Sequence, residues 1–144
     1  MRILFDTSVL VAAMVDAHPA YERAFPWLQR VHAKENDGLI AAHSLAELYS
    51  VLTTLPLRFP VSPEIAQRMI AHNILSTFQV IPLMADDYQA VITHLSRMAL
   101  SGGIIYDALI GHAAIKANAD QISTLNAKDF HRIYPDLAAR IVVP

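Results

Sequence analysis

Four acidic residues of the chain stand where they could act together as ligands of a cation. Asp6 directly follows the apolar run Ile3–Phe5, and the other three occupy comparable positions after later apolar segments: Glu47, Asp107 and Asp129. Residues that follow parallel strands share one edge of a sheet, and open α/β sheets bind their ligands at that edge. The four carboxylates are therefore expected to point into one cleft.

Each acid also has a purely structural interpretation. Asp6 could simply turn the chain from a strand into a helix. Ser44 and Glu47 have the spacing of a capping box, in which the glutamate accepts a hydrogen bond from the backbone N–H of the cap. Asp107, in a first helical turn, would gain about 0.3–1 kcal/mol from the helix dipole, and Asp129 could cap a short helix. Taken singly, the structural interpretation is favoured for Glu47 and Asp129, and both interpretations stay open for Asp6 and Asp107.

The apolar surroundings of two acids favour a bound cation. Asp107 stands between Ile104-Ile105-Tyr106 and Ala108-Leu109-Ile110, and Glu47 likewise lies between apolar neighbours. A lone charge in such a setting is costly unless it is paired or bound to a metal ion. Converging carboxylates would also repel one another and raise the pKa of at least one of them. A hard divalent cation removes this cost, and oxygen ligands with retained water molecules suit Mg²⁺ or Mn²⁺.

Short apolar segments alternate with helical ones along the chain. Strands are predicted at residues 3–5, 39–42, 78–83, 121–125 and 141–143. Helices are predicted at residues 9–15, with Thr7 and Ser8 placed to cap it, and then at 20–34, 43–55, 64–77, 86–100 and 104–118, with a brief helix after residue 126. This alternation predicts one α/β domain over residues 1–144, with a parallel sheet and helices on both of its faces.

The composition narrows the class of protein. Hydrophobic residues make up 54% of the chain and charged residues only 17%, against about a quarter in a typical soluble domain. The surplus indicates a surface buried in a homodimer or under a partner chain, or a sheet covered by helices on both faces. The formal charge of -2 gives no global basic footprint for nucleic acid, although a local groove or metal ions can supply positive charge.

Several classes of site are disfavoured by what the chain lacks. It has no cysteine, which excludes disulfides and thiolate chemistry. No signal peptide is recognisable, and no uncharged apolar stretch reaches the roughly 20 residues of a membrane helix, so a cytoplasmic protein without membrane contact is expected. The seven histidines lack the paired helical spacing of a zinc site. They are interpreted as structural or surface residues, and His112 is expected to have a packing role.

Four stretches of the chain resemble the motifs of PIN-domain ribonucleases. They are Ile-Leu-Phe-Asp-Thr-Ser-Val-Leu-Val at 3–11, Ser-Leu-Ala-Glu-Leu at 44–48, Tyr-Asp-Ala-Leu-Ile at 106–110 and Thr-Leu-Asn-Ala-Lys-Asp-Phe at 124–130. The short length is similar to that of VapC-type toxins of bacterial toxin–antitoxin pairs. The resemblance covers the whole chain and implies a three-layer α/β/α fold with a central parallel sheet of four to five short strands.

The resemblance also implies roles for individual residues. Asp6, Glu47 and Asp107 match the metal-binding acids of the family, and Asp129 would join them as a fourth catalytic acid. Residues expected to support the bound ion are the hydroxyl beside the first acid, the hydroxyl that opens the last motif and the amide two positions later: Ser8, Thr124 and Asn126. Family members carry the fourth acid at either of two positions, here Asn126 and Asp129, and Asp129 is favoured.

The implied reaction is hydrolysis of an RNA phosphodiester with one or two Mg²⁺ or Mn²⁺ ions, so the chain would be an endoribonuclease. Lys128 and Arg132 could hold the RNA backbone, although a solvated surface is the more ordinary role for either. The implied partners are a cognate antitoxin lying over the cleft and a second copy of the chain, with residues 20–34 and 64–77 as docking helices. A non-catalytic PIN-like binding module is the alternative. A phospho-acceptor receiver is disfavoured because Asp6 has no second acid beside it.

Overall fold

The structure, a computed structural model, describes all 144 residues and places five parallel strands in one sheet. The strands are β1 (Arg2–Phe5), β2 (Asp37–Ala41), β3 (Gln79–Ile81), β4 (Gln121–Ser123) and β5 (Ile141–Val142). Their order across the sheet is β3-β2-β1-β4-β5, and every neighbouring pair is parallel. The predicted α/β class and parallel sheet of four to five short strands are confirmed.

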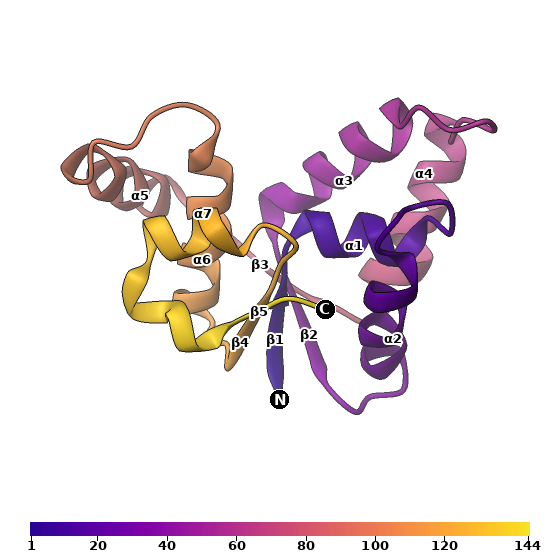
Figure 1. Cartoon of the computed structure of the whole chain (residues 1–144), viewed down its shortest axis with the longest axis horizontal. Coiled ribbons are helices and arrows are strands. Elements are labelled where there is room, and N and C mark those ends of the chain that lie inside the picture. The colour runs from indigo at the N-terminus through magenta and orange to yellow at the C-terminus, as the bar shows by residue number, and fades with distance from the viewer.

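The sheet separates two layers of helices, as Figure 1 shows with the sheet near the middle of the molecule. One layer contains α1 (Thr7–Met14), α2 (Tyr21–His32), α3 (Ala42–Thr54) and α4 (Pro63–Ile70), which a π-helical turn extends over Ala71–Leu75. The other layer contains α5 (Ala85–Arg97), α6 (Ile104–Lys116) and α7 (Ala127–Ile133), followed by a 3-10 turn at Pro135–Arg140. None of these helices combines the length and the hydropathy that a membrane span requires.

Strand β1 joins the two layers because its side chains alternate between the two faces of the sheet. Ile3 and Phe5 belong to the apolar cluster that buries α1 to α4. Leu4 points the other way and belongs to the cluster that contains residues of α6 and α7. All three are almost completely buried. The first apolar run of the chain is therefore the central strand of the sheet, and the residue that follows it emerges between the layers.

Two helix caps predicted from the sequence are absent. Helix α1 begins at Thr7 with Asp6 in the cap position, and no side chain caps it, so the prediction that Thr7 and Ser8 cap this helix is wrong. Helix α3 begins at Ala42, upstream of Ser44, and Ala41 occupies its cap position. Ser44 therefore lies inside the helix, and the capping-box interpretation of Glu47 is also wrong. The Glu47 carboxylate is left for another role.

Candidate active site

Asp6 lies at the end of β1 and is only 4% exposed. Its Oδ2 accepts a hydrogen bond from Ser8 Oγ at 2.5 Å and another from Thr124 Oγ1 at 2.7 Å. Burial raises the pKa of Asp6 above its ordinary value, and the charge of Glu47 raises it further, while the two hydroxyls oppose the rise. Asp6 is thus a buried carboxylate held in one orientation by two neutral donors.

The same two hydroxyls connect α1 to the loop that follows β4. Ser8 Oγ accepts a hydrogen bond from the backbone N–H of Leu125 at 3.1 Å. Thr124 Oγ1 accepts one from the backbone N–H of Asn126 at 2.9 Å. Each hydroxyl therefore donates to Asp6 and accepts from the β4–α7 loop, so the Ser8 hydroxyl is not free to cap α1.

Asp107 lies in the first turn of α6, on the far side of the sheet edge from α3. Its pKa is raised to about 7, first by burial and then by the charges of Asp6, Asp129 and Glu47. A hydrogen bond from Asn126 opposes this rise. The electrostatic repulsion between carboxylates that the sequence predicted is therefore present in the folded chain. The charges of all three other acids raise the pKa of Asp107.

Asn126 connects Asp107 to Asp129. Its Nδ2 donates to Asp107 Oδ2 at 3.0 Å and to Asp129 Oδ2 at 2.7 Å. On its other side, Asp129 Oδ1 lies 3.7 Å from a guanidinium nitrogen of Arg132. Asn126 therefore separates the two carboxylates with an amide group and joins Asp129 to the site indirectly.

Glu47 approaches from the opposite helical layer, on α3. Its side chain is 31% exposed, and Oε1 lies 3.0 Å from His43 Nε2. That oxygen is nevertheless buried and accepts no hydrogen bond. Glu47 thus has a buried carboxylate oxygen that receives no hydrogen bond from the protein.

Three of the four predicted acids line one open groove of about 320 Å³, together with Ser8 and Asn126: Asp6, Glu47 and Asp107. Val11, Val51 and Leu55 form an apolar wall of this groove. Asp129 does not line it; Asp129 and Arg132 line an adjoining hollow of about 250 Å³, to which Asp107 also contributes. A larger hollow, of about 420 Å³, lies near the amino ends of β1 and β2 and contains none of the four acids. The prediction of one shared cleft thus holds for three acids, and Asp129 stands beside it.

Comparison with known proteins identifies the family. The model of the PIN domain matches residues 3–134. This chain belongs to the PIN-domain family. One relative is Ribonuclease VapC40 of Mycobacterium tuberculosis, 36% identical over 115 residues, which are 79% of each chain. Another is Ribonuclease VapC27 of the same organism, 28% identical over 139 residues, which cover 96% of this chain and 93% of the relative.

A solved structure extends this likeness to three dimensions. VapBC2 from Rickettsia felis, bound to a DNA fragment from their promoter, superimposes with a TM-score of 0.67 at 26% sequence identity. The match covers 100% of this chain and 98% of the other. The resemblance drawn from the four motifs is therefore confirmed over the whole length of the PIN domain.

The carboxylates of this PIN domain fit a hard cation. No three of its Asp, Glu and His side chains lie close enough together to hold an ion unaided, but Mg²⁺ commonly binds through one or two carboxylates and keeps several water molecules. Glu47 Oε1 is buried without a donor, and burial together with the charges of the neighbouring acids raises the pKa values of Asp6 and Asp107. A cation among these three carboxylates would satisfy the oxygen and reduce the repulsion.

Two histidines of the PIN domain lie at the site although the sequence interpretation had set all seven aside. His18 lines the groove, and its Nδ1 accepts a hydrogen bond from the backbone N–H of Ala20 at 3.0 Å. His43 precedes Glu47 by one helical turn and contacts it. The i, i+4 spacing of His43 and Glu47 was visible in the sequence, whereas the approach of His18 depends on how the α1–α2 loop folds back.

Proposed function

We propose that this PIN domain is a metal-dependent endoribonuclease that hydrolyses RNA phosphodiester bonds with Mg²⁺ or Mn²⁺. The observation that carries the proposal is the convergence of three carboxylates from different elements on one groove: Asp6, Glu47 and Asp107. Its relatives VapC40 and VapC27, which are named ribonucleases, support the choice of RNA as substrate.

Asp6, Glu47 and Asp107 would hold the ion, which would supply a water molecule of lowered pKa and stabilise charge on the scissile phosphate. The protein contributes the orientation of the carboxylates. Asp6 is held by the hydroxyls of Ser8 and Thr124. Asp107 is held by the amide of Asn126. A carboxylate fixed in this way does not have to reorganise during the reaction, so its stabilisation of the transition state is available at once.

Asp129 and Arg132 serve the substrate more than the ion in this proposal. Both line the hollow beside the acidic groove, and the Arg132 side chain is 54% exposed. Guanidinium groups bind phosphate oxygens with two donors at once. Arg132 is therefore placed to hold a phosphate next to the scissile one, with Asp129 fixing its position. Lys128, exposed and without a charged partner, is a weaker candidate for the same role.

The decisive experiment is RNA cleavage by the purified chain in Mn²⁺, in Mg²⁺ and in EDTA. We expect cleavage only with metal, and we expect Asp107→Asn to lower it by on the order of a hundredfold or more, because several kcal/mol of charge stabilisation is lost. Asp16→Asn is the matched control, since Asp16 is exposed and has no side-chain hydrogen bond or ion pair.

Other outcomes of that experiment separate the alternatives. Cleavage that survives both EDTA and Asp107→Asn would come from a contaminant and would contradict the proposal. A folded chain that binds RNA but never cleaves it would favour the non-catalytic binding module.

We also propose that the chain forms a homodimer and binds a cognate antitoxin, as in VapC-type systems. Large exposed apolar side chains on α3, on the loop after it and along α4 with its π-helical turn support this: Tyr49, Val51, Phe59, Ile65 and Leu75. No large apolar side chain on α2 is exposed to that extent. The support therefore centres on residues 64–77 and is weak for residues 20–34.

Light scattering on the purified chain tests the dimer. We expect the mass of a dimer for the natural chain and of a monomer for the double variant Ile65→Glu, Leu75→Glu, since a buried charge without a partner is strongly unfavourable. Ile115→Glu, on the opposite helical layer and 45% exposed, should stay dimeric. A monomeric natural chain that also fails to bind the product of a neighbouring small gene would contradict both proposed partners.

A further inference from the structure

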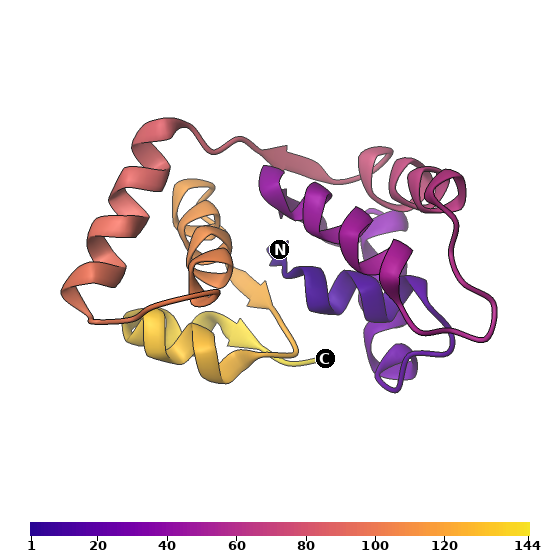
Figure 2. The ribbon, with the colours of Figure 1, turned by 90° about the horizontal axis from the view of Figure 1, so that it is seen from above.

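Helices α3 and α6 carry two of the three groove acids but belong to opposite layers of the molecule. Figure 2 shows them from above, on the two sides of the sheet. The buried residues of α3 pack in the cluster with α1, α2 and α4, and those of α6 pack in two other clusters. The core therefore fixes each helix within its own layer and does not directly fix Glu47 relative to Asp107.

One hydrogen bond joins the two helices. His43, in the first turn of α3, places Nε2 at 3.2 Å from the carbonyl oxygen of Tyr106. No other backbone or side-chain hydrogen bond connects α3 with α6. Tyr106 immediately precedes Asp107, and His43 lies one turn before Glu47, so this bond joins backbone close in sequence to both acids.

The surroundings of His43 determine which ring nitrogen carries the proton. Nε2 faces the Tyr106 carbonyl and also lies 3.0 Å from Glu47 Oε1. Both neighbours are acceptors, so Nε2 must be the N–H donor. Nδ1 is buried and has no hydrogen-bond partner. His43 therefore donates its N–H to the carbonyl next to Asp107 and lies beside the Glu47 carboxylate without forming a hydrogen bond to it.

The start of α6 has particular need of such a contact. Strand β2 runs directly into α3, whereas α6 follows the Ser101-Gly102-Gly103 loop and no strand. Gly102 adopts a φ of +81° there, and neither glycine has a neighbour packed over its Cα. The first turn of α3 thus continues directly from a strand, whereas the first turn of α6 follows a loop.

We propose that His43 is a positioning residue for the metal site, which holds the first turn of α6 against α3 so that Glu47 and Asp107 keep the separation an ion requires. This inference rests on the proposed metal-dependent function. It assigns His43 no contact with RNA or with the ion; His43 acts through the backbone of Tyr106 and the carboxylate of Glu47.

Calorimetric titration of the RNA-free chain with Mn²⁺ tests this role. We expect His43→Leu, which removes the donor at similar size, to weaken Mn²⁺ binding by about tenfold or more, as is usual when the residues that orient metal ligands are changed. His43→Gln places an amide N–H at a reach similar to that of Nε2 and should recover most of the loss. His131→Leu, a change of an exposed histidine without a side-chain hydrogen bond, should bind Mn²⁺ like the natural chain.

The outcomes separate this inference from the proposed function. Unchanged Mn²⁺ affinity in His43→Leu, or equal loss in His43→Leu and His43→Gln, would overturn the positioning role alone. A natural chain that binds no Mn²⁺ would overturn the metal-dependent function and this inference with it. Thermal unfolding of each variant shows whether it is folded; if His43→Leu is not, His43→Asn takes its place, because its shorter amide cannot reach the carbonyl and should show the same loss.

Discussion

At the scale of single residues, the types of the site residues were predictable but their hydrogen bonds were not. The order of Asp6, Glu47 and Asp107 between apolar segments indicated a shared cleft, and the structure brings these three together. The bridging amide of Asn126 could not be foreseen, because its contacts with Asp107 and Asp129 depend on side-chain geometry at the start of α7. The sequence offered Asn126 and Asp129 as alternatives for the position of the fourth acid. In the structure the two side chains are joined by a hydrogen bond.

Asp107 gives a pH prediction at this scale. Its pKa is 3.8 in the unfolded chain and about 7 in the folded one, so the folded state holds the proton longer as the pH rises. The stability that the neutral carboxyl provides is full below pH 3.8 and is lost as the pH rises through about 7. In EDTA, Asp107→Asn should therefore unfold at a Tm about 3 °C or more above the natural chain at pH 8, with little difference at pH 4. A higher Tm for the natural chain at pH 8 would contradict the raised pKa.

At the scale of elements, the alternation of strands and helices was predictable, and the ends of the helices were less so. Ser62 caps α4 through the backbone N–H of Ile65 at 3.2 Å, as its position before Pro63 indicated. The caps expected at Thr7, Ser8 and Ser44 failed because the helices start earlier than those residues require. Of the three hydroxyls only that of Ser8 has another partner, Asp6, whereas those of Thr7 and Ser44 are buried without a hydrogen bond.

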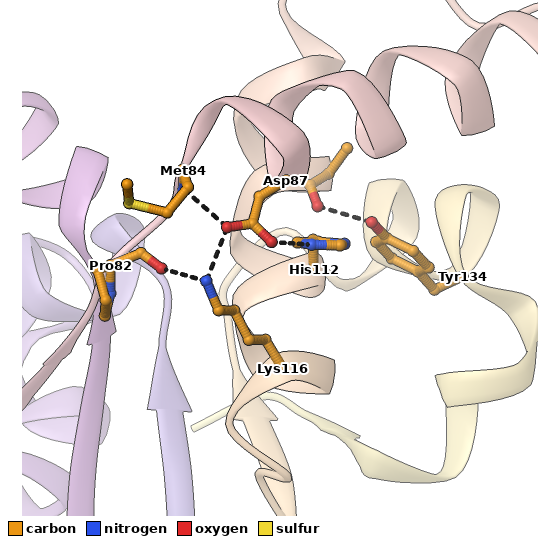
Figure 3. Close-up of polar contacts among 7 residues, drawn as sticks. Pro82, Met84, Asp87, His112, Lys116 and Tyr134 are labelled. Carbon is orange, nitrogen blue, oxygen red and sulfur yellow. Dashed lines mark hydrogen bonds and ion pairs between the residues drawn. The ribbon is translucent and has the colours of Figure 1, made fainter.

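Asp87 provides the clearest contact between elements outside the site (Figure 3). Its carboxylate accepts from the backbone N–H of Met84 at 2.7 Å, from Lys116 Nζ at 2.7 Å and from His112 Nε2 at 2.9 Å. Lys116 Nζ also donates to the carbonyl oxygen of Pro82 at 2.9 Å. These hydrogen bonds connect α6 to the start of α5 and to the residue that follows β3. His112, expected to pack, takes part through a polar contact.

The Asp87 cluster predicts an acid-sensitive contribution to stability. The hydrogen bond from Lys116 holds the pKa of Asp87 well below 3.8, with help from Met84 and His112. Because the folded-state pKa is depressed, the stabilisation is full above pH 3.8 and is lost progressively as the pH falls from there toward the lower folded-state pKa. Asp87→Asn should therefore lower the Tm by several degrees at pH 7, and this difference should shrink as the pH is lowered from 3.8 toward about 2. Asp86→Asn, a change of the exposed neighbour, should leave the Tm unchanged over the whole range.

At the scale of the whole molecule, the layered parallel sheet was predictable and the strand order was not. Alternating strands and helices are compatible with many orders, and only tertiary packing places β1 between β2 and β4. This order decides the site, since it brings the end of the first strand beside the end of the fourth. The two clusters of apolar side chains on either face of β1 supply the packing that selects it.

Metal binding should therefore stabilise the molecule as a whole. Asp6 lies at the end of the central strand, and Glu47 and Asp107 belong to opposite helical layers. An ion bound by these carboxylates would therefore connect both layers with the sheet. At a hundredfold excess over its Kd, Mn²⁺ should add about 2.7 kcal/mol to the free energy of unfolding, which raises the Tm by several degrees. Glu47→Gln should abolish most of this shift and Asp16→Asn should keep it. An equal rise in Tm with Glu47→Gln would show that Mn²⁺ binds elsewhere.

The hydrogen bond between Thr124 and Asp6 spans 118 positions of the chain, and this has a consequence during translation. Asp6 is among the first residues made, but β4 and Thr124 are not available to it until most of the chain has left the ribosome. Until then, the nascent polypeptide can orient Asp6 only through Ser8, and it lacks both the Thr124 hydroxyl and the Asn126 amide that holds Asp107. Contacts between such distant segments also form late in folding. A chain that ends before β4 would keep Asp6, Glu47 and Asp107 but would lack Leu125 and Asn126 of the groove and the Thr124 hydroxyl that orients Asp6.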